Sequence, residues 1–204
     1  MIKVIAWDFD GVLNRSWADG AHAWQRDFER DLGASLQSFH EAVFADGFHR
    51  IITGAEDVRG RVASWVAKSQ STASADEVLD YWFAKDARAD DEMLALMQRL
   101  DDRGVRQVIA TNNEARRTAF IRDQMGFGAR VETIFASGHI GAMKPDSAFF
   151  DHVSAALGVP LADILLVDDR EANVIAAQKS GWHGFHFTDA TRAALADYIS
   201  ARLT

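Results

Sequence analysis

The sequence predicts an α/β protein with a parallel sheet flanked by helices and a four-helix bundle inserted after the first strand. From about residue 88 onward, apolar runs of strand length alternate with amphipathic helical segments, and four of these helices end at a glycine. A glycine just past a helix is a common C-terminal cap because it tolerates positive φ. Repeated β–α units of this kind pack as a parallel sheet covered by helices. Residues 15–87, in contrast, carry helical periodicity and no strand pattern.

The first predicted strand is the apolar run over residues 4–7, which ends in two carboxylates, Asp8 and Asp10, followed by Gly11. Successive strand residues point to opposite faces, so Asp8 and Asp10 would share one side. Two carboxylates 4 Å apart repel by about 4 kcal/mol at an effective dielectric of 20. A bound cation or a proton on one carboxylate must offset that repulsion, and both are tools of phosphoryl transfer.

The insert shows apolar residues at three- and four-residue steps in four stretches, which predicts four helices. We expect Trp17, Trp24 and Phe28, from the first stretch, to lie in the core of this bundle. Residues 53–56 and 74–77 both match the capping-box pattern of a helix start. The four stretches are Trp17, Ala21, Trp24, Phe28 and Leu32; Leu36, Phe39, Val43 and Phe44; Val58, Val62 and Trp65; and Val78, Leu79 and Trp82.

The rest of the chain continues the alternation of helix and strand. Helices are predicted over residues 94–100, 114–124, 147–157 and 172–180, and strands over residues 105–111, 131–135, 164–167 and 183–187. We therefore expect two units. Residues 1–14 and 88–204 form the sheet unit, and residues 15–87 form the helical one.

Composition narrows the classes of partner. The 204 residues carry a formal net charge of -8 without a basic tract, which disfavours nucleic acid and anionic membranes. The chain has no cysteine, so it has neither a disulfide framework nor a thiolate metal site. It shows no leader pattern and no apolar run of the ~18 residues that a spanning helix needs. We expect a cytoplasmic monomer or homodimer that acts on a small molecule.

Four polar signals stand at or just beyond the ends of predicted strands or in the loops that follow them. The carboxyl ends of parallel strands share one edge of a sheet, where open α/β folds bind ligands, so these groups should cluster. Carboxylates suit a divalent cation, whereas a lysine, a hydroxyl and free amides suit phosphate oxygens. The four signals are Asp8-x-Asp10, Thr111-Asn112-Asn113, Lys144-Pro145-Asp146 and Asp168-Asp169.

In their order and spacing these signals resemble the motifs of the haloacid dehalogenase superfamily of phosphohydrolases, and the resemblance covers essentially the whole chain. The helical insert after the first motif resembles the cap domain of that family. The resemblance implies a Rossmann-like catalytic core of residues 1–14 and 88–204 and a cap of residues 15–87. Asp8-Phe9-Asp10-Gly11-Val12 resembles the first motif, Thr111 the second, Lys144 the third and Asp168-Asp169 the fourth.

The resemblance also implies a mechanism. Asp8 would be the nucleophile that forms a covalent aspartyl-phosphate, and Asp10 would be the general acid and base. A free aspartate has a pKa near 3.9, so Asp10 would need a raised pKa to donate a proton at neutral pH. Mg²⁺ would bind Asp8, the backbone carbonyl of Asp10 and Asp169, with Asp168 close by or acting through water.

Three residues would hold the phosphate group by the same resemblance. Lys144 would neutralise charge on the nucleophile and on the transferring group, while the Thr111 hydroxyl and the Asn112 backbone N–H would bind phosphate oxygens. Ordinary structural roles stay open for each motif. Lys144 can be a solvated loop lysine, Thr111 a strand-end residue, and Asp168-Asp169 a pair favoured by a helix dipole.

Other polar residues receive simpler interpretations. Asn173 either braces the loop of the fourth motif or is a plain helix position. His139 is expected to be structural, and Arg116 and Arg117 are expected to be solvated helix charges. Phe48 and the loops beside it are the part of the insert that could face the site.

The retained Asp10 favours phosphate chemistry over carbon–halogen cleavage, because the dehalogenase branch lacks an aspartate there. A phosphomutase of the β-phosphoglucomutase type shares every core motif and stays open. Residues 54–56, together with the Ser137 to Asp146 pattern, are similar to bacterial sugar-phosphate phosphatases of the α-D-glucose-1-phosphate phosphatase type. Ala55 stands where that group has an acidic residue. The expected activity is Mg²⁺-dependent hydrolysis of a small phosphorylated metabolite, specifically a sugar phosphate.

Two non-enzymatic classes share part of the pattern. Receiver domains cluster aspartates, a threonine and a lysine on a parallel sheet, but they lack a helical insert after the first strand. A phosphate-binding module without turnover is the other class. The presence of both Asp8 and Asp10 disfavours it.

Overall fold

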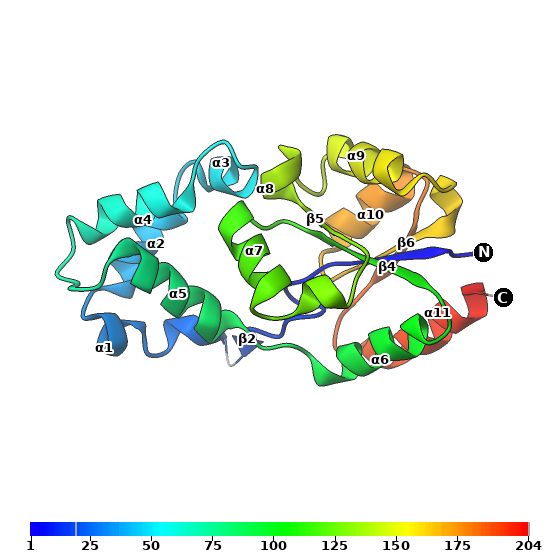
Figure 1. Ribbon diagram of the computed structural model, residues 1–204, viewed down its shortest axis with the longest axis horizontal. Helices are drawn as coiled ribbons and strands as arrows, with labels where there is room; N and C mark the ends of the chain where they lie inside the picture. Colours follow the sequence, from blue (N-terminus) through cyan, green and yellow to red (C-terminus); the bar gives the residue numbers. More distant parts are fainter. Residues whose placement is uncertain (19, 204) are drawn as a thin grey trace.

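The sheet has five parallel strands, and the first strand of the chain lies at its centre (Figure 1). The strands are β1 Val4–Trp7, β4 Arg106–Thr111, β5 Ile134–Ala136, β6 Ile164–Asp168 and β7 His183–His186. Their order is β5-β4-β1-β6-β7 in this computed structural model, which describes residues 1–18 and 20–203. Val4 pairs with Arg106 on one side and with Ile164 on the other. The predicted α/β class and its parallel sheet are confirmed.

Helices cover both faces of the sheet, because each strand buries side chains on two sides. Helices α6 and α11 lie on one side of the sheet, and α9 and α10 lie on the other (Figure 1). Trp7 of β1 packs in the core on the first side, whereas Ala6 packs in the core on the second. The helices of this unit are α6 Asp91–Asp101, α7 Ala115–Asp123, α8 Ser137–Ile140, α9 Ser147–Leu157, α10 Glu171–Lys179 and α11 Leu195–Leu203. Short 3-10 turns span Phe127–Ala129, Leu161–Asp163 and Arg192–Ala194.

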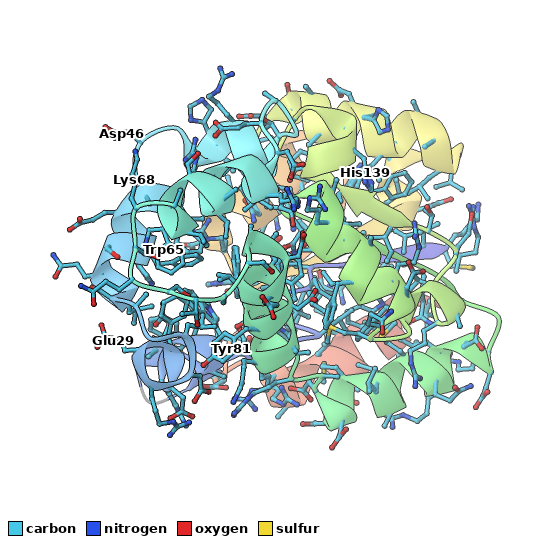
Figure 2. The ribbon with its side chains drawn as sticks, turned by 60° about the vertical axis from the view of Figure 1, so that its left-hand side comes forward. Glu29, Asp46, Trp65, Lys68, Tyr81 and His139 are labelled. Carbon is cyan, nitrogen blue, oxygen red and sulfur yellow. The ribbon has the colours of Figure 1, made fainter. Side chains whose placement is uncertain are left out.

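The helical insert, which we call the cap (residues 15–87), has its own aromatic core. Trp24 and Phe28 are buried in it, as the sequence predicts, together with Phe39. Figure 2 looks onto the cap, where Trp65 lies among the helices and Glu29 and Lys68 lie at the rim. Its helices are α1 Phe28–Leu32, α2 Leu36–Val43, α3 Phe48–Ile52, α4 Val58–Val66 and α5 Ala75–Asp86.

The start of the cap differs from the prediction. The described part of the cap has five helices where four were predicted, and the first predicted helix, from Trp17 to Leu32, forms an α-helix only over its last residues, as α1. Strands β2 (Trp17–Ala18) and β3 (Ala21–His22) pair antiparallel instead, and a 3-10 turn, Ala23–Gln25, follows. Trp17 is 60% exposed and lies outside the cap core, contrary to expectation. The aromatic spacing is compatible with a helix, but the pair Asp19-Gly20 in the sequence is a hairpin signal that outweighs it.

The two capping patterns have different outcomes. Ser74 caps α5 reciprocally with Glu77, as predicted. The pattern over residues 53–56 does not start a helix, because Thr53 ends α3 and Asp57 caps α4 through the backbone N–H of Arg59.

The cap touches the sheet unit on the side away from its two linkers. Ser137 of α8 donates a hydrogen bond to the carbonyl oxygen of Ile52 at 2.7 Å. Arg116 of α7 forms two hydrogen bonds of 2.8 Å with Asp57 at the start of α4. Among the described helices, none has the length and apolar character needed to cross a membrane.

Candidate active site

The polar groups that follow the strands converge on one cavity of about 600 Å³, where the sequence analysis expects them to cluster. The cap contributes Ser16, Trp17 and His22 to the wall of this cavity. Asp168 is completely buried behind it, next to Lys144. The sequence-predicted residues that line the cavity are Asp8, Asp10, Thr111, Asn112, Lys144 and Asp169.

Asp8 stands at the end of the central strand with one carboxylate oxygen held in place. Its Oδ1 accepts a hydrogen bond of 2.8 Å from the backbone N–H of Phe9 and lies 3.0 Å from Nζ of Lys144. Burial raises the pKa of Asp8 to about 8 even though Lys144 opposes the rise, and Asp168 and Asp169 add to it. Ionised Asp8 therefore needs more positive charge than the described residues supply.

Lys144 is 1% exposed, so its ammonium group is part of the interior and not a solvated loop charge. Its Nζ donates to the Ala110 carbonyl oxygen at 2.6 Å and to Asp168 at 2.5 Å. Burial alone would lower the pKa of Lys144, but the charges of Asp8 and Asp168 outweigh burial and raise it. The ammonium form is therefore retained at neutral pH.

Asp168 is positioned by Asn173, which donates from Nδ2 to both carboxylate oxygens at 2.9 and 3.1 Å. The backbone N–H of Arg170 donates to Asp168 Oδ1 at 2.8 Å. Asn173 thus braces the loop, which is the first of the two interpretations considered for it. Both oxygens of Asp168 are occupied by protein donors.

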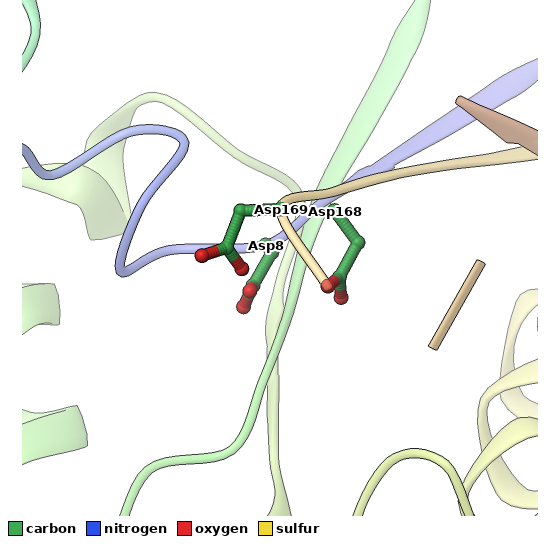
Figure 3. A group of neighbouring side chains, drawn as sticks. All are labelled: Asp8, Asp168 and Asp169. Carbon is green, nitrogen blue, oxygen red and sulfur yellow. The ribbon is translucent and has the colours of Figure 1, made fainter. Parts of the chain in front are cut away.

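Three carboxylates could hold a metal ion. Oxygens of Asp8, Asp168 and Asp169 lie within 4.8 Å of one another. Figure 3 shows these side chains side by side at the ends of β1 and β6. Burial and the charge of Asp168 raise the pKa of Asp169. A hard divalent cation such as Mg²⁺ fits this all-oxygen donor set and would relieve the repulsion.

Gly11 supports the same cluster. It has φ +89°, and a Cβ at this position would overlap the Asp169 carboxylate. Glycine therefore allows the loop after β1 to pass directly beside Asp169.

The side chain of Asn112 holds the loop that carries Lys144. Its Nδ2 donates to the Lys144 carbonyl oxygen at 2.8 Å, and its Oδ1 accepts from the Lys144 backbone N–H at 2.9 Å. Thr111 Oγ1 accepts a hydrogen bond of 2.8 Å from Asn113. Thr111 and Asn112 both belong to the lining of the cavity.

Asp10 is held by a hydrogen-bond network that the sequence does not predict. Its carboxylate accepts hydrogen bonds from Asn14 at 2.9 Å, Asn113 at 3.0 Å and Arg117 at 2.8 Å. Burial favours a higher pKa for Asp10, but the Arg117 charge and these hydrogen bonds outweigh burial and lower it. In the protein without substrate, the pKa of Asp10 is therefore shifted away from the raised value that a general acid at neutral pH would need.

Arg117 is the main residue that sequence reasoning missed. It is 5% exposed and pairs with Asp10 at 2.8 Å and with Asp86, at the end of the cap, at 2.7 Å. The interpretation as a solvated helix charge is wrong for Arg117, although it suits the half-exposed Arg116. The spacing of residues in α7 does not indicate which of the two arginines is buried. His139 is exposed and lies in the lining of neither this cavity nor the adjoining pocket on the cap side, so its structural role stays a prediction.

Comparison with known proteins identifies related sequences. Residues 2–181 match the family model of haloacid dehalogenase-like hydrolases. A sesquiterpene phosphatase of Aspergillus oryzae is 36% identical over 102 residues, which cover 50% of this chain and 52% of that protein. The chain thus spans about half the length of this curated relative.

Two bacterial relatives are similar over longer stretches. A phosphoglycolate phosphatase of Neisseria gonorrhoeae is 26% identical and is aligned over 88% of this chain and 77% of its own length. A validoxylamine A 7'-phosphate phosphatase of Streptomyces hygroscopicus is 25% identical over 100% of this chain and 95% of its own length.

Solved structures share the fold at low sequence identity. A Bacteroides thetaiotaomicron enzyme of the same family, in complex with magnesium and inorganic phosphate, has a TM-score of 0.77 at 17% identity and covers 92% of this chain and 95% of its own. The L-2-haloacid dehalogenase of Xanthobacter autotrophicus has a TM-score of 0.68 at 15% identity, with 98% and 83% covered. At these identities the likeness shows the fold alone.

Proposed function

The chain belongs to the haloacid dehalogenase-like hydrolases, and from this premise we propose that it is a Mg²⁺-dependent phosphatase of a small phosphorylated metabolite. The observation that carries the proposal is the pairing of Asp8 with a buried lysine while Asp10 lines the same cavity. A nucleophile, a fixed positive charge and a second carboxylate are the parts that phosphoryl transfer through an aspartyl-phosphate requires.

In the first half of the proposed reaction, an oxygen of Asp8 attacks phosphorus and the bond between phosphorus and the alcohol oxygen breaks. Asp8 Oδ1 is fixed by Phe9 and Lys144, which leaves Oδ2 as the attacking atom. Asp10 gives its proton to the departing alcohol oxygen. The phosphate dianion that binds beside Asp10 adds negative charge, which raises the low pKa of Asp10 toward the value this donation needs.

In the second half, a water molecule attacks phosphorus and the bond to Asp8 breaks, which releases inorganic phosphate. Asp10, now ionised, accepts the proton of the attacking water. The hydrogen bonds from Asn14, Asn113 and Arg117 favour this ionised form and orient it. Its lowered pKa keeps Asp10 ionised, so the carboxylate is free to accept this proton, although the same shift weakens it as a base.

Asp8, Asp169 and the backbone carbonyl of Asp10 are the proposed ligands of Mg²⁺, with Asp168 behind them fixing Lys144. Bound Mg²⁺ would neutralise phosphate charge and so allow an anionic nucleophile to approach. The donor set fits the ion because all its atoms are carboxylate or carbonyl oxygens.

The phosphate oxygens are assigned to three groups in this proposal. Nζ of Lys144 provides charge, while the Thr111 hydroxyl and the Asn112 backbone N–H provide hydrogen bonds. The cap would cover the bound ester and exclude large substrates such as phosphoproteins. The sugar-phosphate class stays a prediction from sequence resemblance, since the relatives are named for a sesquiterpene, for phosphoglycolate and for validoxylamine A 7'-phosphate.

Phosphate release from a panel of phosphate monoesters, measured with Mg²⁺, tests this function. We expect release that depends on Mg²⁺, stops with EDTA and is abolished in Asp8→Asn. Product analysis separates hydrolysis from transfer of phosphate to a second hydroxyl, as a mutase would do. Absence of release from a folded protein that binds Mg²⁺ would contradict the proposal.

A further inference from the structure

A second cavity of about 300 Å³ adjoins the catalytic one on the cap side, and the two share Asp10, His22 and Asn112 in their walls. Its volume lies at the lower end of the range of about 300–1,000 Å³ for ligand pockets. We call it the aromatic pocket, after the apolar and mostly aromatic side chains that the cap contributes besides its polar ones. These are Trp24, Phe44, Phe48, Ile52 and Trp82.

The aromatic side chains form one continuous surface. The Phe44 ring lies 4.9 Å from that of Phe48 and 5.1 Å from that of Trp82, measured between centroids. Phe44, Phe48 and Ile52 are half-buried, so part of each side chain faces the cavity instead of the cap core. Apolar surface in this position favours an apolar ligand group.

Two polar side chains at the rim of the pocket, Gln25 and His40, are engaged with each other. Gln25 Nε2 lies 2.9 Å from His40 Nε2, and the His40 ring stacks on Trp24 with centroids 5.6 Å apart. Burial, with a contribution from His22, lowers the pKa of His40, which keeps this imidazole neutral at pH 7. The Asp86 carboxylate also lines the pocket, and its Oδ1 has no hydrogen-bond partner among the described residues.

The polar groups on the sheet side are engaged as well. Arg117 pairs with Asp10 and Asp86, and the Glu114 carboxylate accepts from the backbone N–H groups of Arg116 and Arg117. Asn113 donates to Asp10 and to Thr111. The hydroxyls of a sugar would lose their hydrogen bonds to water here and would have to compete for these partners, which is unfavourable.

From this geometry we propose that the aromatic pocket receives the leaving group, so that the substrates are phosphate monoesters of apolar alcohols. The inference rests on the proposed function, in which Asp10 protonates the leaving oxygen. Because Asp10 lies in the wall of both cavities, an ester bound at Asp8 and Lys144 can direct its alcohol part past Asp10 into the aromatic pocket. The assignment replaces the sugar expected from sequence resemblance with an aliphatic or aromatic group.

A series of n-alkyl phosphates tests the assignment, because all its members are primary alkyl esters with similar leaving groups. With Mg²⁺, we expect kcat/KM to rise from ethyl to octyl phosphate by as much as about fourfold for each methylene that is fully buried. Glucose 1-phosphate and glucose 6-phosphate should be poorer substrates than octyl phosphate. A naphthyl phosphate, assayed in parallel, shows whether the pocket prefers an aromatic or an aliphatic alcohol group.

Binding provides a readout that does not depend on turnover. Alkylphosphonates cannot be hydrolysed at their phosphorus–carbon bond, so calorimetry on the wild-type protein with Mg²⁺ measures affinity alone. The dissociation constant should fall with chain length in parallel with kcat/KM.

Phe48→Gln places an amide in the aromatic pocket and should lower kcat/KM about tenfold more for octyl than for ethyl phosphate. Phe120→Gln is the matched control. Phe120 is also a half-buried phenylalanine packed against the cap core, but it lies in the lining of neither cavity. It should leave the chain-length dependence unchanged.

The outcomes separate the two proposals. Metal-dependent hydrolysis with no chain-length dependence, or with glucose phosphates preferred, would overturn the assignment of the leaving group and leave the phosphatase intact. Equal effects of Phe48→Gln and Phe120→Gln would also overturn it. Failure to release phosphate from every ester, p-nitrophenyl phosphate included, would overturn the phosphatase and the leaving-group assignment together.

Discussion

Arg117 joins two buried or half-buried carboxylates from different parts of the chain, Asp10 and Asp86. Arg117→Ala leaves both without their cation, and loss of one member of a buried pair costs about 3–5 kcal/mol. Urea unfolding should show this loss. Arg116→Ala, which removes an exposed ion pair on the same helix, should cost at most about 1 kcal/mol. Equal losses in the two variants would mean that Arg117 is not a structural link.

Asp10 should matter most when the leaving group is poor. An activated aryl phosphate needs little protonation of its departing oxygen, whereas an alkyl phosphate depends on it. Asp10→Asn should therefore lower kcat/KM by roughly 10²–10⁴-fold on an alkyl ester and by much less on p-nitrophenyl phosphate. Equal losses on both esters would show that Asp10 is not the acid.

The raised pKa of Asp8 predicts how the free energy of unfolding of the metal-free protein depends on pH. Its folded pKa, about 8, lies above the ordinary value of 3.8, so the folded state binds more protons between these values. The free energy of unfolding should then fall as pH rises from about 4 to about 8, by at most about 1.4 kcal/mol per unit from this group. Asp169, whose pKa is also raised, contributes in the same direction.

Mg²⁺ should flatten this dependence, because it binds the ionised carboxylates of the folded state. Unfolding measured from pH 5 to 8 with EDTA and with Mg²⁺ checks the expectation. Asp8→Asn serves as the control, since it removes the contribution of Asp8 in both conditions. A flat profile of the wild type in EDTA would contradict the raised pKa.

Residues at strand ends could be predicted because a short motif fixes both their chemistry and their place. Asp8 and Asp169 follow strands that are readable from apolar runs, and a parallel sheet brings those ends together. Arg117 could not be found in this way. Its importance arises from Asp86, which is distant in sequence and meets it only because the cap folds back onto α7.

At the scale of elements, the contact between the end of α3 and α8 depends on glycine. Gly54 has φ +75°, and a Cβ there would overlap the carbonyl oxygen of Gly138. Gly54→Ala should therefore lose roughly 1–2 kcal/mol from backbone strain and also separate the cap from α8. When measured on the fully folded variant, kcat/KM should also fall.

Gly33→Ala is the control for this contact. Gly33 has φ +64° in the cap as well, but a Cβ there would meet no atom of the described residues within 4 Å, apart from its neighbours in the chain. Gly33→Ala should therefore introduce the same backbone strain as Gly54→Ala but leave kcat/KM unchanged. A similar loss of activity in both variants would show that strain, and not the α3–α8 contact, is responsible.

Most helices and strands of the sheet unit could be predicted because their apolar residues follow the clear pattern of a helix or of a buried strand. The strand over residues 164–167 and the helix over residues 147–157 agree with β6 and α9 to within one residue. The cap was harder, since Trp17, Trp24 and Phe28 satisfy helical spacing although a hairpin places Trp17 at the surface. Spacing alone does not distinguish a helix from a hairpin followed by a turn and a short helix.

At the scale of the whole molecule, the cap docks on the sheet unit through Arg116, Ser137 and Phe120. We expect it to open and close about residues 14–17 and 85–89. Trypsin should cut after Arg15 and Arg88 more slowly when Mg²⁺ and inorganic phosphate hold the cap closed. Cleavage after the exposed Arg103 and Arg130 should not change. Unaltered cleavage after Arg15 and Arg88 would contradict closure.

Asn14 ties together the two linkers of the insert. Its Nδ2 donates to Asp10 at 2.9 Å and to the Asp86 carbonyl oxygen at 3.0 Å, while its Oδ1 accepts from the backbone N–H of Arg88 at 2.7 Å. The chain thus leaves the sheet and returns to it at one anchored junction. A chimaera that joins a foreign insert at this junction would keep the reaction chemistry and acquire a new range of substrates, so selectivity in this architecture can diverge as an exchangeable module.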